Sequence, residues 1–373
     1  MLRLAQSATL KEPLPTLRIG HHIAHYPIVQ GAMAVRVSGA NLVGAVANAG
    51  GVGVISSLGL GLNSPYFNVQ IRRGNFFLAN QLALIDELQK ARALSPTGII
   101  GVNILIATKD YPVTVRTAAE NGANLIITAA GLPLDLPEYT ANHPEVALVP
   151  MVCGLEAVQT ICQTWHEKYD RLPDAFIVEN SKAVGGHIGT TCEDFDSQIE
   201  SLTPKIQSYL QHQLQVNIPL IAAGGIWDRS DVDRMLALGA SGVQVGTRFI
   251  TTEECDADRR YKEFHLHARP EDVVIIPSPV GKPARALRNT LAEKAIVASP
   301  NLERRCIANC LEHCLCRDSR KSYCILQALA NAAHGDVENG LVFSGANVGR
   351  ADRILSVAEV MAELTSVQEV AIA

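Results

Sequence analysis

Short apolar runs recur eight times between residues 26 and 245, and segments with helical spacing of apolar residues lie between them. Runs of this length are typical of buried strands. A regular alternation of strands and helices predicts an α/β fold with a parallel sheet. The expected strands are residues 26–30, 52–56, 98–105, 125–128, 146–152, 175–178, 219–223 and 242–245. The expected helices between them are residues 41–48, 82–94, 113–121, 155–168, 195–213 and 231–238.

Two parallel folds share this alternation, the doubly wound sheet and the closed (β/α)8 barrel. Glycines and polar side chains follow the ends of many of the expected strands, as the loops on the active-site face of a barrel do. We therefore expect an α/β protein with a TIM (β/α)8 barrel over residues 20–290. A helical, cysteine-rich extension over residues 291–373 is expected to follow and to pack on the barrel.

The charge and the hydropathy of the chain exclude two classes of partner. Its 373 residues carry a net charge of −5 without a dense cluster of Lys and Arg, so we expect no nucleic-acid partner. No uninterrupted run approaches the roughly 20 apolar residues that a membrane helix needs. The first fifteen residues lack the apolar core of a signal peptide. We therefore expect a cytoplasmic protein without a membrane partner.

Glycine turns follow the last two expected strands. Gly224 and Gly225 follow the seventh, and Gly246 and Thr247 follow the eighth. Such turns either make tight connections only or offer backbone N–H groups to a phosphate. The loops after the seventh and eighth strands are the usual phosphate site of a barrel, so a phosphorylated cofactor or substrate is expected here.

Other polar or small residues stand at strand ends. The turn at residues 30–33, QGAM, is either a plain turn or a place where backbone approaches a planar ring. Asn103 and Glu179 either satisfy local backbone groups or bind a ligand. His187 follows two glycines and is either structural or a general base, because imidazole titrates near neutral pH.

Five cysteines gather in the extension, on an expected helix at residues 301–316 and at the start of another at residues 323–333. On a helix, the spacing of four would align three thiols for a zinc ion or an iron–sulfur cluster. Apolar residues share that face, however, and a free Cys behaves as a small buried hydrophobe. We expect reduced thiols and no metal. The five residues are Cys306, Cys310, Cys314, Cys316 and Cys324.

Several segments carry a resemblance when their order and spacing are taken together. They are PIVQGAM, AVANAGGVGVISS, GVNILIA, VENSKAVGGHIG, IPLIAAGGI, GVQVGTRF and VGKPARALRN, and they run from residue 26 to residue 289. The set resembles the nitronate monooxygenase family and its relatives, the FMN-dependent enoyl-ACP reductases. Two departures from the family pattern are Ala32, where many members have glycine, and a loop after Glu179 that is about one residue longer.

The resemblance implies a TIM barrel that holds FMN without a covalent bond. His187 matches the family's active-site histidine. The residues implied near the isoalloxazine ring are Gly31, Ala32, Met33, Asn103 and Glu179. The residues implied around the ribityl phosphate are Gly185, Gly186, Gly224, Gly225, Gly246 and Thr247. The later segment GDVENGLVFSGANVGR resembles a tail found in part of the family, and no role is assigned to it.

Three functions are compared. The first is FMN-dependent oxidation of alkyl nitronates by O2 to a carbonyl compound and nitrite, with His187 either steering the anion or deprotonating a neutral nitroalkane. The second keeps FMN but reduces an enoyl thioester with NAD(P)H. The third is a non-enzymatic metal-binding or redox-sensing protein that uses the cysteines. We expect the first, with a small-molecule substrate and O2 as partners, and leave the choice between monomer and homodimer open.

Overall fold

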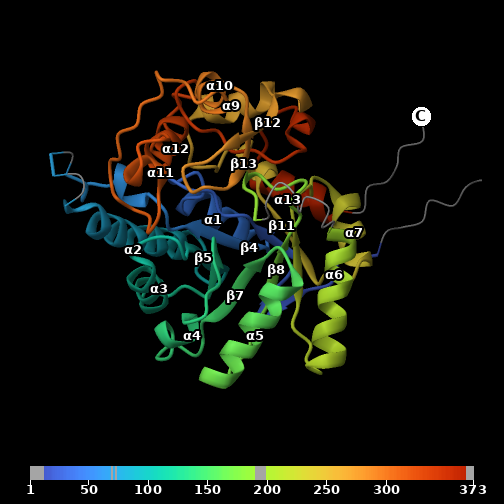
Figure 1. The fold of residues 1–373 in the computed structure, drawn as a ribbon. Coiled ribbons are helices and arrows are strands. Elements are labelled where there is room, and N and C mark those ends of the chain that lie inside the picture. The colour runs from blue at the N-terminus through green and yellow to red at the C-terminus, as the bar shows by residue number, and fades with distance from the viewer. Residues whose placement is uncertain (1–11, 69, 72–73, 190–198, 367–373) are drawn as a thin grey trace, which may run out of the picture.

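Eight parallel strands close into a barrel in the computed structural model, which describes residues 12–68, 70–71, 74–189 and 199–366 (Figure 1). This confirms the expected TIM (β/α)8 barrel. The last strand pairs with the first, so the sheet has no free edge. In chain order the strands are β3 (Ile28–Gln30), β4 (Val52–Ser56), β5 (Ile99–Leu105), β6 (Leu125–Ala129), β7 (Ala147–Val152), β8 (Phe176–Glu179), β10 (Leu220–Ala223) and β11 (Gly242–Val245).

A helix follows each barrel strand. Most bounds agree with the expected ones, but α2 begins six residues early because its first turn packs inward through the buried Phe76. The expected helix at residues 195–213 is observed from Ile199 onward, and its first four residues lie outside the described residues. No helix in the described part of the chain is long and apolar enough to cross a membrane. The helices are α1 (Ala40–Asn48), α2 (Phe76–Leu94), α3 (Tyr111–Glu120), α4 (Leu136–Tyr139), α5 (Leu155–Tyr169), α6 (Ile199–Ser208) with a π-helical end (Tyr209–Gln213), α7 (Arg229–Ala237) and α8 (Thr247–Ile250).

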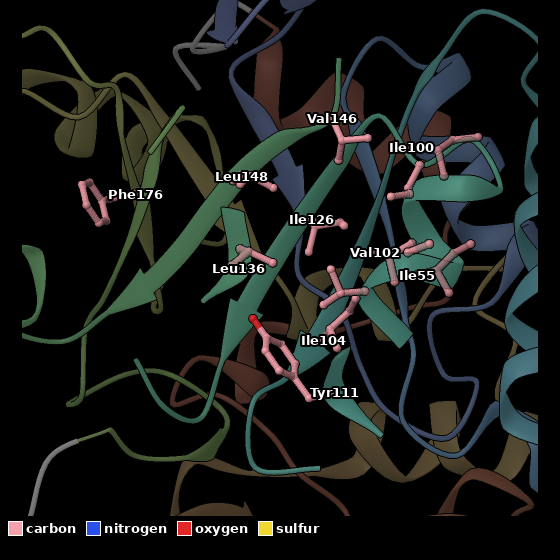
Figure 2. Packing of buried hydrophobic residues seen from close by; sticks show 14 of the residues in the cluster. Ile55, Ile100, Val102, Ile104, Tyr111, Ile126, Leu136, Val146, Leu148 and Phe176 are labelled. Atoms are coloured by element: carbon pink, nitrogen blue, oxygen red, sulfur yellow. The ribbon is translucent and has the colours of Figure 1, made fainter. Parts of the chain in front are cut away.

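The strands bury both faces, which explains why the sequence shows apolar runs and not a simple alternation. Ile55, Ile126, Leu148 and Phe176 belong to the layer between the strands and the outer helices (Figure 2). Their neighbours in sequence point the other way and fill the inside of the barrel. These inner residues are Val54, Ile127, Val149 and Ile177.

A hairpin that the sequence did not predict packs against the amino ends of the strands. It consists of β1 (Leu17–Ile19) and β2 (His22–Ala24), which pair antiparallel. Leu17 and Ile19 join the inner cluster of the barrel and are almost fully buried. The hairpin therefore fills this end of the barrel and leaves the carboxyl ends of the strands for the site.

The chain after β11 lies over the carboxyl ends of the strands (Figure 1). A three-stranded antiparallel sheet joins it to the barrel, because β13 (Pro283–Leu287) pairs with both β12 (Val273–Pro277) and β9 (Gly186–His187). β9 belongs to the loop after β8, so the barrel and the chain that follows β11 share this sheet. The remaining helices are α9 (Arg259–His267), α10 (Thr290–Ile296), α11 (Leu315–Asp318), α12 (Ile325–Ala333) and α13 (Val357–Thr365).

The last helix returns to the barrel. Val360 and Leu364 of α13 pack with Val46 of α1 and Met235 of α7, so α13 lies between these two helices of the outer ring. The helical, cysteine-rich extension is thus present. The division of the chain at residue 290 stays a prediction.

The expected cysteine-rich helix at residues 301–316 is wrong. The chain there is irregular up to Cys314 and turns through a left-handed residue, Asn309 (φ 57°). The backbone of this stretch pairs with the loop after β5: the N–H of Lys109 donates to the carbonyl of Cys310 at 3.1 Å, and Leu311 bridges Thr108. These partners in the barrel replace the bonds that a helix would form within itself.

Candidate active site

The candidate residues meet at one end of the barrel because parallel strands all finish at the same edge. Gly31 follows β3, Asn103 lies near the end of β5, and Glu179 is the last residue of β8. Gly224 and Gly246 follow β10 and β11. The structure thus brings the residues of five different strands to one face.

The turn after β3 is organised by a buried glutamine. Gln30 donates from Nε2 to the carbonyl of Gly31 at 2.6 Å and to Ser38 Oγ at 2.9 Å, and it accepts from the backbone N–H of Val54. The same Ser38 hydroxyl accepts from the N–H of Met33 at 2.9 Å. Ser38 was not expected as a site residue, and Gln30 was expected only as part of the turn at residues 30–33; the signal for its buried side chain was a single polar residue that ends an apolar run.

The turn after β3 contacts the turn after β11 through Gly31 and Gly246. The N–H of Gly31 donates to the carbonyl of Val245 at 2.8 Å. A methyl group at Gly31 would lie 3.2 Å from the Cα of Gly246. A methyl group at Gly246, in contrast, would meet nothing within 4 Å. Open space therefore lies beside Gly246, at the start of α8.

Gly224 and Gly225 turn sharply after β10, with φ of 101° and 80°. Both values belong to the left-handed region that glycine adopts at low cost. A methyl group at Gly224 would lie 2.7 Å from a methyl group of Val184, and one at Gly225 would lie 3.0 Å from Cβ of Ala183. The loop after β8 thus packs directly on this turn. We call Gly224, Gly225, Gly246 and Thr247 the glycine cradle.

Gly185 lies where the loop after β8 meets the tail of the chain. A methyl group at Gly185 would lie 2.6 Å from the carbonyl carbon of Ser344 and 2.7 Å from the nitrogen of Gly345. These are backbone atoms, so a larger residue would displace the tail. Thr247 of the cradle also contacts the tail, since its hydroxyl accepts from the N–H of Gly345 at 2.9 Å.

His187 is placed by the sheet that β9 forms with β13, in which it pairs with Ala284. Its Nε2 lies 2.7 Å from Ser278 Oγ, and its ring meets the Phe343 ring edge-on with centroids 5.3 Å apart. Burial, and then the charge of Lys282, lowers the pKa of His187 to about 4. The imidazole is therefore neutral at pH 7. Ser278 was missed because only the pairing of β12, β13 and β9 brings it here.

Glu179 and Asn103 differ in what they can do. Burial raises the pKa of Glu179 to about 7, although the positive charge of Lys282 acts in the opposite direction. Asn103 donates from Nδ2 to the thioether of Met151 at 3.7 Å, a weak acceptor. Glu179 therefore titrates near neutral pH, and the amide of Asn103 has hydrogen-bonding capacity to spare.

The two basic residues of the KPAR segment have separate roles. Arg285 is buried and donates to the carbonyl oxygens of Val184 and Ser181, which lie in the loop between Glu179 and Gly185. Lys282 is exposed at the turn between β12 and β13. Arg285 thus holds the loop, and Lys282 supplies positive charge near the site.

The extension's cysteines lie mostly in one buried apolar cluster. Cys310, Cys314, Cys316 and Cys324 are buried in an apolar cluster with Leu311. Burial raises the pKa of Cys310 to about 12, and a hydrogen bond with Cys306 together with burial raises that of Cys324. Among the residues that the structure describes, no three His, Cys, Asp or Glu side chains are placed to hold a metal ion.

Comparison with known proteins extends these observations. A family model described as nitronate monooxygenase matches residues 16–367. A probable nitronate monooxygenase of Staphylococcus saprophyticus is 27% identical over 284 residues, which cover 72% of this chain and 77% of that protein. The (3aS,4S,5R,7aS)-5-hydroxy-7a-methyl-1-oxo-octahydro-1H-indene-4-carboxyl-CoA dehydrogenase of Mycobacterium tuberculosis is 28% identical over 285 residues, with 76% and 68% covered.

Solved structures share the whole architecture. FabK from Thermotoga maritima is 25% identical with a TM-score of 0.69, covering 91% of this chain and 92% of that one. A nitroalkane oxidase from Streptomyces ansochromogenes has a TM-score of 0.68 at 19% identity, covering 91% and 95%, and this likeness shows the fold alone.

The closed barrel defines a (β/α)8 fold, and the family model identifies the protein as an enzyme of the oxidoreductase class. The family model covers nearly the entire described chain. The chain belongs to the nitronate monooxygenase family, a family of flavin-dependent oxidoreductases.

Proposed function

We propose that this protein is an FMN-dependent nitronate monooxygenase that converts alkyl nitronates and O2 into a carbonyl compound and nitrite. The family match supports the class of reaction. The observation that carries the proposal is the meeting of a glycine cradle and a neutral imidazole at one end of the barrel. Both lie on the loop system of β8, β10 and β11.

The residues present fit a flavin phosphate. Space is open beside Gly246, where no atom lies within 4 Å of the position that a methyl group would take. The hydroxyl of Thr247 accepts from Gly345, so its own hydrogen remains available to donate to a phosphate oxygen. Gly225 has no side chain that could keep a phosphate from the backbone of its turn. We assign the phosphate to the cradle, with Gly185 and Gly186 beside the ribityl chain.

The flavin ring is assigned to the face between β3 and β8. Gly31, Ala32 and Met33 would line it with backbone, in the turn that Gln30 holds. Asn103 would donate to the ring, because its present partner is a weak acceptor. Glu179 would lie at the opposite side, from the end of β8.

FMN, when bound, supplies the electron acceptor of the reaction. The chain's own residues bind and orient the substrate beside it. The N–H of the His187 ring would donate a hydrogen bond to an oxygen of the nitronate. The contacts with Ser278 and Phe343 fix the plane of the ring. The chain after β11 lies over the carboxyl ends of the strands and would cover this side of the site (Figure 1).

The protonation state of His187 favours a nitronate over a neutral nitroalkane as substrate. A general base works best when its pKa is near the working pH. An imidazole with a pKa of about 4 is a weak base at pH 7. We therefore assign His187 to hydrogen bonding with an anion that arrives already deprotonated.

An anaerobic titration of the purified protein with propionate 3-nitronate tests this function. We expect the nitronate alone to bleach the flavin absorption, and air to restore it with release of nitrite. His187→Asn should retain FMN but lose most of the turnover. A flavin that the nitronate leaves oxidised would contradict the proposal.

A second candidate is the reduction of an enoyl thioester by NAD(P)H. The structural likeness to FabK, at 25% identity over nine tenths of both chains, favours it. Rapid anaerobic reduction by NADPH, followed by reoxidation with crotonyl-CoA and no response to nitronate, would select this reaction. The use of O2 and a cytoplasmic location are part of the proposal. The oligomeric state, monomer or homodimer, is left open.

A further inference from the structure

The tail segment at residues 343–347 runs through the candidate site. It follows α12 and lies beside β13, where Phe343 bridges Ala286 and the N–H of Leu287 donates to the carbonyl of Val342 at 2.8 Å. It thereby extends the sheet that carries His187. This is the FSGAN stretch of the segment to which the sequence assigned no role.

The segment then bonds to three different loops of the barrel. The N–H of Gly345 donates to Thr247 Oγ1 at 2.9 Å, after β11. The N–H of Ala346 donates to the carbonyl of Ala183 at 3.1 Å, after β8. Nδ2 of Asn347 donates to the carbonyl of Gly225 at 2.7 Å, after β10. One short stretch of chain therefore connects the two loops of the cradle with the loop after β8.

Its first residue contacts His187. The Phe343 ring meets the imidazole at an angle of 70°, and the same ring lies 3.4 Å from the position of a methyl group at Gly186. The carbonyl of Phe343 lies 3.3 Å from Nε2 of His265, a buried histidine whose Nδ1 lies 2.9 Å from the carbonyl of Tyr261. The backbone of Phe343 therefore lies against His265 of α9.

We propose that residues 343–347 are a positioning element that sets both the cofactor cradle, through Gly345 and Asn347, and the His187 ring, through Phe343. The cradle half of this inference rests on the proposed function, since it assumes FMN as the occupant. The part of the inference that concerns His187 does not depend on the proposed function. The segment acts through the loops that it holds, and its backbone packs too closely on Gly185 to admit a side chain there.

The first test measures FMN affinity by fluorescence titration of flavin-free protein. Asn347→Ala removes the bond to the Gly225 carbonyl and should weaken FMN binding about tenfold, the effect of one lost hydrogen bond of the stronger kind. Asn331→Ala is the matched control. Asn331 lies in α12, and its side-chain amide also donates to a backbone carbonyl, that of Asn339. It should bind FMN like the wild type. Equal affinity in Asn347→Ala and the wild type would overturn the cradle half.

The second test needs no flavin. The pKa of His187 is followed by NMR in flavin-free protein, with the signal identified by its loss in His187→Gln. Phe343→Ala removes one apolar wall and should raise that pKa from about 4 toward 6.5, whereas Phe77→Ala, a control in α2 whose ring packs edge-on against Phe76, should leave the pKa of His187 unchanged. An unchanged pKa in a folded Phe343→Ala would overturn the His187 half. A wild-type protein that binds no FMN would instead refute the proposed function, and this titration would still decide the role of Phe343.

Discussion

A methyl group added at Gly246 should weaken cofactor binding without disturbing the fold. The backbone there has φ −105° and ψ −77°, which alanine can adopt, and the added methyl group meets no protein atom within 4 Å. Gly246→Ala should therefore fold as well as the wild type. If the flavin phosphate occupies that open space, the same methyl group intrudes on it.

Gly246→Ala should raise the stability of the fold and lower the affinity for FMN, and both changes are large enough to measure. Replacing glycine at a compatible position stabilises a protein by about 0.4–1 kcal/mol, because the unfolded chain loses freedom. Overpacking by one methyl group costs about 1–3 kcal/mol, which corresponds to roughly 5-fold to 150-fold weaker binding. Thermal unfolding of flavin-free protein and FMN titration measure the two quantities on the same sample.

Gly154→Ala provides the control for this experiment. A methyl group there also meets nothing within 4 Å, its φ of −163° is extended, and it lies in the loop between β7 and α5, which is not one of the loops of the cradle. FMN affinity should be unchanged in Gly154→Ala and reduced in Gly246→Ala. A Gly246→Ala protein that keeps wild-type FMN affinity would show that the phosphate lies elsewhere.

Three further changes probe the charges around the site. Lys282→Gln should raise the pKa of both Glu179 and His187, because Lys282 favours the carboxylate and disfavours the imidazolium; NMR titration that shows no upward shift would refute its placement. Glu179→Gln should stabilise the protein at pH 8 by up to about 3 kcal/mol and leave it unchanged at pH 4. The sign follows because a carboxyl whose folded pKa is raised from 4.5 to about 7 loses stability as the pH rises through that window. Arg285→Lys should lower the free energy of unfolding by about 2–3 kcal/mol and weaken FMN binding, since one ammonium cannot reach both carbonyl groups that the guanidinium holds; an unchanged melting temperature would contradict this.

The barrel could be predicted from the sequence because its strands are buried on both faces. An apolar run such as that of β8 stands out from its polar flanks, and its bounds differ from the expected ones by one residue. The sharp turn after β10 could also be predicted, since a left-handed turn at Gly225 requires glycine. These signals are local, and a single sequence carries them directly.

The other parts of the site depend on contacts between distant residues. The pairing of β9 with β13 joins positions almost 100 residues apart and alone places Ser278 beside His187. The contact of Gly345 with Thr247 joins positions 98 residues apart. The cysteine spacing misled the helix prediction, because residues 107–109 of the barrel supply that stretch with backbone partners. Local periodicity contains no information on such partners.

The glycine cradle is proposed to bind the phosphate of FMN. The most direct measurement compares the dissociation constants of FMN and riboflavin, which differ only in that phosphate, with the flavin-free wild-type protein. If the cradle donates two charge-assisted hydrogen bonds of about 1.5 kcal/mol each to the phosphate, FMN should bind at least about a hundredfold more tightly than riboflavin. Equal affinities for the two flavins would contradict the account.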